Sequence, residues 1–307
     1  MKTRPTMAPQ PSPPNPPDER FSAFGLVLLA AVSLFWGINW SVMKIILRDI
    51  PPLYFRSTTL ILAGLGLLAV ARAGGHKIKI PQSAWRPLIG ISLFNITAWN
   101  CLIIYGVSMI PSGRAALLGY TMPLWSSLLS MYFLGERIVW QRIASLVCGL
   151  AGIAVLMGND FAAIRAAWLG TLCMIAAAWC WAIGIVLLKR QRVAMPTIVL
   201  TAWSMVFGGL PLLVAALPLE TSRLIVPGTA AILGVVYTIF LNFMLCYWAW
   251  NRIVLMLPVS VSSLSSLGVP LIGVVSGALL LNESLGWREA LAAALILSSV
   301  ASVSIRR

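Results

Sequence analysis

Tryptophan, asparagine and lysine recur at helical spacing inside stretches that otherwise carry mostly apolar side chains. Trp36, Trp40 and Lys44 stand at positions i, i+4 and i+8, which places them on one face of a helix. Asn95 and Trp99 repeat the four-residue spacing further along the chain. Indole faces attract cations and stack on flat groups, and amides hydrogen-bond to carboxylates or ammonium groups. These residue types indicate binding of a small molecule.

Acid–base catalysis has few candidate residues. None of the eight Asp and Glu residues lies in the middle of an apolar stretch, and the single histidine, His76, falls in a basic loop. An integral membrane enzyme acting on lipid-linked substrates would gather His, Asp, Glu or Cys side chains at one membrane face. The five cysteines have no metal-like spacing and are expected to pack as small apolar residues. We therefore predict that the protein is not an enzyme and needs no metal or cofactor.

The elements that carry these residues have the composition of membrane spans. Sixty per cent of the 307 residues are hydrophobic and 10% are charged, against roughly 25% charged in soluble domains. The long stretches without Asp, Glu, Lys or Arg are residues 21–43, 87–113, 115–135, 166–188, 193–219, 224–251 and 253–282. Shorter stretches at 57–71, 143–158 and 290–305 become full spans once flanking residues are added. We predict an all-α integral membrane protein with ten transmembrane helices.

Landmark residues recur at one offset along the chain. Pro123 and Pro270 lie 147 positions apart, and so do Glu136 and Glu283. The other pairs at this offset are Pro111 with Pro258, Trp140 with Trp287, and Asn95 with Asn242. Because the offset carries the chain through five helices, the second copy enters the membrane inverted. We predict two inverted five-helix repeats, residues 21–158 and 159–307, after a disordered proline-rich cytoplasmic tail, residues 1–20.

The matched prolines are expected to kink their spans. A proline inside a helix removes one backbone hydrogen bond, and small neighbouring residues allow close contact and bending. We predict hinges at Gly119 and Pro123 in the fourth span and at Gly268 and Pro270 in the ninth.

The distribution of basic residues predicts the orientation of the chain. With the N-terminus in the cytoplasm, 15 of the 22 Lys and Arg residues fall inside. The other 7 fall outside or near the outer ends of spans: Lys44, Arg48, Arg56, Arg114, Arg165, Arg223 and Arg288. This asymmetry predicts that both termini are cytoplasmic. The net charge of +14 is therefore attributed to orientation in the lipid bilayer and not to a nucleic-acid partner.

Several motifs are similar to those of a known family. The first span contains "LFWGINW", the fourth ends in "FLGE" after Pro123, and the ninth ends in "LLNE" after Pro270. With the five-plus-five arrangement, residues 22–305 resemble the EamA type of the drug/metabolite transporter (DMT) superfamily, in particular the YddG aromatic amino-acid exporters. The resemblance implies export of amino acids and similar small metabolites across a bacterial inner membrane by alternating access. The first span lacks the glutamate of small multidrug relatives, which disfavours lipophilic cations.

Eleven residues are predicted to contact the substrate. They are Trp36, Asn39, Trp40, Lys44, Asn95, Trp99, Asn100, Tyr120, Trp179, Trp181 and Asn242. Other roles stay open for each type: interhelical hydrogen bonds for the amides, packing or lipid contact for the indoles, and snorkelling for Lys44.

Several functional alternatives also stay open. The missing mid-span carboxylate favours facilitative transport over proton coupling, and the alternative substrates are neutral drugs or aromatic xenobiotics. A phosphorylated substrate would need basic residues deep in the cavity, whereas Lys44, Arg56 and Arg114 are expected toward the outside. The sequence leaves the oligomeric state open and is compatible with a monomer.

Overall fold

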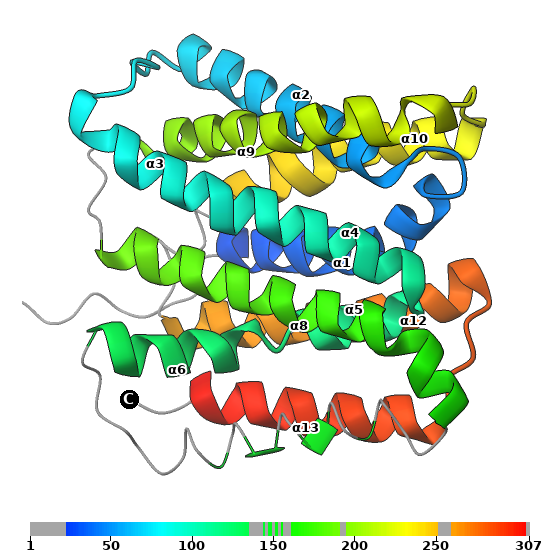
Figure 1. Ribbon diagram of the computed structural model, residues 1–307. Helices are drawn as coiled ribbons and strands as arrows, with labels where there is room; N and C mark the ends of the chain where they lie inside the picture. Colours follow the sequence, from blue (N-terminus) through cyan, green and yellow to red (C-terminus); the bar gives the residue numbers. More distant parts are fainter. Residues whose placement is uncertain are drawn as a thin grey trace, which may run out of the picture.

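The computed structural model describes residues 23–134, 144, 147–148, 151–152, 155, 161–190, 195–250 and 259–304. Within these residues the secondary structure is helical throughout (Figure 1). The helices of the first half are α1 (Ala23–Ile46), α2 (Pro52–Ala73), α3 (Trp85–Ile91), η2 (Ser92–Ala98), α4 (Trp99–Met109), α5 (Ser112–Gly119) and α6 (Met122–Leu134). Those of the second half are α8 (Phe161–Arg190), α9 (Thr197–Glu220), α10 (Thr229–Tyr237), η4 (Thr238–Leu245), α12 (Val259–Leu281) and α13 (Trp287–Ser304).

Six of the described helices are long and apolar enough to cross a membrane. They cover Val27–Ile46, Pro52–Ala73, Gln82–Met109, Ala167–Leu188, Thr197–Arg223 and Thr229–Trp250. The all-helical membrane class is therefore confirmed for the described chain. The count of ten spans stays a prediction, because most of residues 143–158 lie outside the described part.

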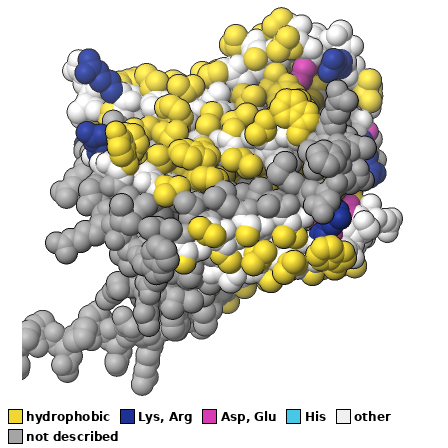
Figure 2. Space-filling model, turned by 60° about the horizontal axis from the view of Figure 1, so that its bottom comes forward, with side chains coloured by type: hydrophobic (Ala, Val, Ile, Leu, Met, Phe, Trp, Pro, Cys, Tyr) yellow, Lys and Arg dark blue, Asp and Glu magenta, His cyan; other side chains and the backbone are white. Residues whose placement is uncertain are grey.

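Large apolar side chains cover the outer surface of the helices. Figure 2 shows hydrophobic side chains across the middle of one face, with Lys and Arg toward its ends. On α9, Val214 is 67% exposed and Leu217 is also exposed, as are Leu62 and Leu65 on α2. Soluble monomers rarely expose apolar patches of this extent, so the surface fits contact with lipid tails.

Helices from the two halves of the chain alternate in space. α2 packs along α9, α1 packs along α12, and α4 and α6 both pack against α8. In Figure 1 the blue α1 accordingly lies near the orange α12, while α4 runs beside α8. The centre of the molecule is therefore built jointly by residues from both halves.

Two π-helical segments interrupt the regular helices at corresponding places. η2 covers Ser92–Ala98 and η4 covers Thr238–Leu245, so adding the sequence offset of 147 to residues 92–98 gives 239–245. Asn95 and Asn242 each lie inside one of these segments. A π turn contains an extra residue, often at a functional site, and it shifts the side chains that follow to another face.

Beside Pro123 the structure shows a break between two helices in place of a kink within one continuous helix. α5 ends at Gly119, Tyr120 and Thr121 form a turn, and α6 begins at Met122. Proline has no N–H to donate to a preceding carbonyl but is tolerated in a first helical turn, and Pro123 occupies such a position. Pro270 lies inside the continuous helix α12.

A buried carboxylate joins the end of α9 to the start of α2. Oε2 of Glu220 accepts hydrogen bonds from the backbone N–H groups of Leu53 at 2.8 Å and Tyr54 at 3.1 Å. The first N–H groups of a helix have no partner within the helix, and the helix dipole favours negative charge there. Glu220 therefore caps α2 from another part of the chain.

Replacing Glu220 by alanine is expected to lower the free energy of unfolding by ~1–3 kcal/mol, because two buried donors lose their acceptor. Thermal unfolding in detergent micelles measures the loss. The matched control is Asp49→Ala, since Asp49 accepts one exposed hydrogen bond from Gly228 N at 2.8 Å and should matter far less. Equal melting-temperature shifts in the two variants would contradict the assignment of Glu220 as a buried cap.

Candidate functional site

A small pocket lies between helices of the two halves. Its volume of about 60 Å³ has room for only a few water molecules, since each needs roughly 10–15 Å³. The lining residues are Trp36, Asn39, Trp40, Met43, Arg56, Trp99, Asn100, Ile103, Tyr120, Met122, Trp181, Asn242, Phe243 and Tyr247. Most of the predicted contact residues therefore lie around one cavity, which would have to widen to hold an amino acid.

Paired aromatic rings form much of the pocket wall. The ring centroids of Trp99 and Trp181 lie 4.9 Å apart, and those of Trp36 and Tyr247 lie 5.6 Å apart. Trp36 also donates its indole N–H to the backbone oxygen of Asn242 at 3.1 Å, which fixes the plane of the ring. The first pair joins α4 to α8, and Trp36 joins α1 to η4 and the helical residues that follow it. A movement between these helices would reshape the wall.

Three buried asparagines add polar groups to this wall: Asn39, Asn100 and Asn242. Asn100 donates from Nδ2 to the Ile96 carbonyl at 2.8 Å, a bond within its own helix. Oδ1 of Asn39 is buried and has no hydrogen-bond partner among the described residues. An unpaired buried acceptor is costly, so Asn39 is available to a donor that enters the pocket.

The structure corrects the expected position of Arg56. The sequence suggested an outer position, near the start of a span, but the side chain is 2% exposed and lines the pocket. Its guanidinium lies 5.1 Å from the ring centroid of Phe55 and 5.5 Å from that of Phe243, and Nη2 contacts the sulfur of Met43. The sequence does show that Arg56 stands directly before the uncharged stretch that begins at residue 57. It does not show that the Arg56 side chain points into the protein.

Three predicted contact residues lie away from this pocket: Asn95, Trp179 and Lys44. The Asn95 side chain packs against Gly184 of α8, where a Cβ added to the glycine would come within 2.6 Å of the Asn95 Cβ. Trp179 pairs instead with Trp125, at a ring-centroid distance of 4.9 Å. Asn95 lies within η2, whose extra residue per turn breaks the predicted one-face relation with Trp99.

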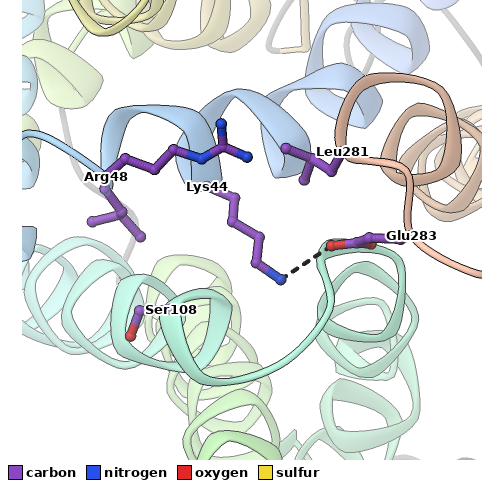
Figure 3. Close-up of a pocket in the computed structure, with 6 residues that line it drawn as sticks. Lys44, Arg48, Ser108, Leu281 and Glu283 are labelled. Carbon is purple, nitrogen blue, oxygen red and sulfur yellow. Dashed lines mark hydrogen bonds and ion pairs between the residues drawn. The ribbon is translucent and has the colours of Figure 1, made fainter. Parts of the chain in front are cut away.

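Lys44 lies in a second pocket of about 320 Å³ near the C-terminal end of α1. Figure 3 shows its ammonium group pointing toward Glu283, with Arg48, Ser108 and Leu281 around the space. Nζ of Lys44 lies 3.1 Å from Oε1 of Glu283 and donates to the carbonyl of Ile110 at 3.0 Å.

Glu283 also caps the start of α5. Its carboxylate accepts hydrogen bonds from Ser112 N at 2.8 Å, Ser112 Oγ at 2.9 Å and Gly113 N at 3.2 Å. A second ion pair, between Arg114 and Glu289 at 2.6 Å, ties α5 to α13. We call this cluster the Glu283 latch, consisting of Lys44, Ser112, Gly113 and Glu283. It joins α1 and α5 of the first half to the segment after α12.

The latch shifts the titration of Glu283. Burial raises the pKa of its carboxyl. The hydrogen bonds from Ser112, Lys44 and Gly113 together lower the pKa by more than burial raises it, so the pKa lies below the ordinary value of 4.5. A lowered pKa means that the closed latch favours the charged form. Its contribution is therefore complete above pH 4.5 and is lost as the pH falls through the lowered pKa.

We expect the latch to stay closed from neutral pH down to about 4.5 and to loosen only at lower pH. Spin labels can be attached at positions 48 and 281, on opposite sides of the second pocket. The distance between the two labels should increase when the latch opens. The same labels in Glu283→Gln should show no pH dependence. If the distance between the labels instead changed near neutral pH in the protein with Glu283 in place, the attribution of latch opening to Glu283 would be contradicted.

Comparison with known proteins gives a family match over most of the chain. The model of the EamA-like transporter family matches residues 23–158 and again residues 168–305. A solved crystal structure superposes with a TM-score of 0.68 at 21% identity, covering 92% of this chain and 97% of that one. At this identity the superposition supports the fold alone.

Two bacterial relatives cover nearly the whole chain. The "Uncharacterized transporter YoaV" of Bacillus subtilis is 28% identical over 277 residues, which are 87% of this chain and 92% of that protein. The "Probable amino-acid metabolite efflux pump" of Escherichia coli is 28% identical over 286 residues, 89% of this chain and 92% of that protein.

Proposed function

Since the chain belongs to the EamA-like transporter family, as its motifs predicted, we propose that this membrane transporter exports amino acids, aromatic ones among them. The observation that carries the proposal is the central pocket, whose aromatic pairs and buried polar groups suit a molecule with an aromatic side chain and a polar end. The printed name of the Escherichia coli relative supports the same substrate class.

Alternating access between two inverted repeats, residues 21–158 and 159–307, is the mechanism that fits this pocket best. It is supported by the corresponding π-helical segments and by the interleaving of helices from the two halves around the cavity. In this mechanism the Glu283 latch closes the outer side, and the pocket widens when helices separate. The two repeats then interchange their conformations, which exposes the site to each side of the membrane in turn.

One of the proposed hinges lies beside the pocket, and the other lies in a helix that packs along α1. A Cβ on Gly119 would come within 2.8 Å of the Trp40 ring, so bending at the α5–α6 break beside Pro123 would move a pocket wall. Pro270 lies in α12, and Gly268 of the same helix lies near Ser33 of α1. Bending at these positions would change the pocket without unfolding either helix.

The proposed location is a bacterial inner membrane with both termini in the cytoplasm, in agreement with the basic-residue distribution. Transport is proposed to be facilitative. The described carboxylates act as caps or ion-pair partners near helix ends: Asp49, Glu220, Glu283 and Glu289. None of these four lines the central pocket, so none offers a proton site there.

Counterflow in proteoliposomes tests the proposal. We expect labelled phenylalanine or tryptophan to accumulate when unlabelled amino acid is trapped inside, at a rate that an imposed pH gradient does not change. Exchange that depends on the gradient would contradict facilitative transport. Absence of exchange for every amino acid by a folded protein would overturn the substrate and favour neutral drugs.

Two tryptophan pairs provide a matched test of the pocket. Trp181→Ala is expected to reduce exchange at least ~10-fold, because truncating a binding hot spot, a class enriched in Trp, costs ~2 kcal/mol or more. Trp179→Ala should leave exchange nearly unchanged, although both residues pack against another indole at a centroid distance of 4.9 Å. Initial rates at equal reconstituted amounts check this contrast, and equal losses would show that only packing is affected.

A further inference from the structure

We propose that Arg56 binds the substrate's carboxylate in the central pocket, an inference that rests on the proposed function and narrows it to molecules carrying this group. The guanidinium projects from α2 into the wall that also contains Asn39, Trp36 and Trp181. No other Lys or Arg lines this pocket among the described residues.

The guanidinium has unused hydrogen-bonding capacity. Nε and Nη1 of Arg56 have no hydrogen-bond partner in the described part of the chain, and Nη2 contacts only the Met43 thioether. The faces of Phe55 and Phe243 attract the positive charge, but they accept none of its five N–H donors in a conventional hydrogen bond. A buried charge with unpaired donors inside a membrane is costly and typical of a functional site.

Acidic side chains in the described segments are already engaged elsewhere. Glu220 caps α2 and Glu283 caps α5. Glu289 pairs with Arg114, and Asp49 accepts from Gly228 N. An anion that pairs with Arg56 must therefore come from outside this set, and a carboxylate matches the planar guanidinium geometrically.

A second buried group without a partner in the pocket suits the other end of an amino acid. Oδ1 of Asn39 is buried without a partner among the described residues, and an ammonium group would donate to it. The Trp99–Trp181 and Trp36–Tyr247 pairs then surround the side chain. The site therefore selects a zwitterion with an aromatic or apolar side chain, and it disfavours amines that lack a carboxylate.

Competition against labelled phenylalanine in counterflow tests this on the unmodified protein. Phenylalanine amide lacks the carboxylate and should compete at least ~100-fold more weakly, while 3-phenylpropionate lacks only the ammonium and should compete about 10-fold more weakly, since charge-assisted hydrogen bonds are the strong ones. Equal competition by phenylalanine and its amide would overturn the role of Arg56 while leaving amino-acid export intact.

Variants locate the effect. Arg56→Gln should remove the preference for phenylalanine over its amide, and Arg56→Lys should retain part of it, because a lysine keeps the charge but not the planar fork. Arg48→Gln is the control, since Arg48 lines the second pocket and should not alter the preference. If Arg56→Gln does not fold, the ligand series on the unmodified protein decides alone.

The two proposals fail in different ways. If no amino acid exchanges but 3-phenylpropionate raises the melting temperature of the unmodified protein by more than it raises that of Arg56→Lys, the carboxylate site is supported and amino-acid export is wrong. If neither exchange nor carboxylate-dependent stabilisation occurs, both proposals are overturned.

Discussion

Glu283→Ala is expected to open the outer side of the transporter and to increase the rate at which a pocket cysteine is labelled from outside by about 10–100-fold. The variant removes the acceptor for Lys44, Ser112 and Gly113 at once. Hydrogen bonds to a charged group contribute roughly 1.5–3 kcal/mol each, and water in the open state replaces much of this. A net shift of ~1.4–2.8 kcal/mol gives the stated range.

The measurement is the labelling rate of Ile103→Cys, a pocket position, in a chain whose own cysteines are replaced. Glu289→Ala is the matched control, because it removes the ion pair with Arg114 but leaves the Glu283 latch in place, so a smaller change is expected. Amino-acid exchange should also slow in Glu283→Ala, since the outer side closes less often. An unchanged labelling rate would show that the latch does not control access.

Trp40→Ala is expected to cost ~3–5 kcal/mol of stability, the usual loss when a buried Trp is truncated. Trp40 is 4% exposed and its ring fills the space between α5 and α12. A Cβ on Gly119 would come within 2.8 Å of the ring, and one on Gly273 within 3.2 Å. Because both helices contact the ring through glycines at these two points, neither glycine supplies a side chain to fill the cavity.

Thermal unfolding in detergent measures this loss, with Trp85→Ala as the control. Trp85 is 40% exposed and pairs with Phe207 at a centroid distance of 5.5 Å, so its truncation leaves no enclosed cavity. Similar decreases in melting temperature for both variants would mean that Trp40 is not part of a tightly packed centre. If Trp40→Ala keeps its melting temperature but loses amino-acid exchange, Trp40 contacts the substrate and does not stabilise the fold.

Much of this organisation could be predicted from residue patterns. Long uncharged stretches predicted the spans that the structure describes, because a bilayer requires about 20 apolar residues per helix. The motifs around Pro123 and Pro270 predicted the family that the comparison then confirmed. The indoles and amides of α1 and α8 were expected near one another, since polar groups in apolar helices turn toward the protein interior, and Asn39 and Trp181 do line one pocket.

The remaining features depend on geometry that spacing does not reveal. The π turn of η2 separates Asn95 from the pocket while Trp99 lines it. The break before Pro123 depends on the turn at Tyr120 and Thr121, which replaces the expected kink. Arg56 stands near a helix start, where most arginines reach the membrane surface. Its inward direction follows only from how α2 packs.

The central claim is that one pocket between the two halves is exposed to each side of the membrane in turn. Ile103→Cys, at the pocket wall, tests it in oriented membrane vesicles with an impermeant thiol reagent added to one side or the other. We predict labelling from both sides, slowed on both by phenylalanine, with Glu283→Ala shifting reactivity toward the outside. Labelling from one side only, in the unmodified latch and in the variant alike, would contradict alternating access.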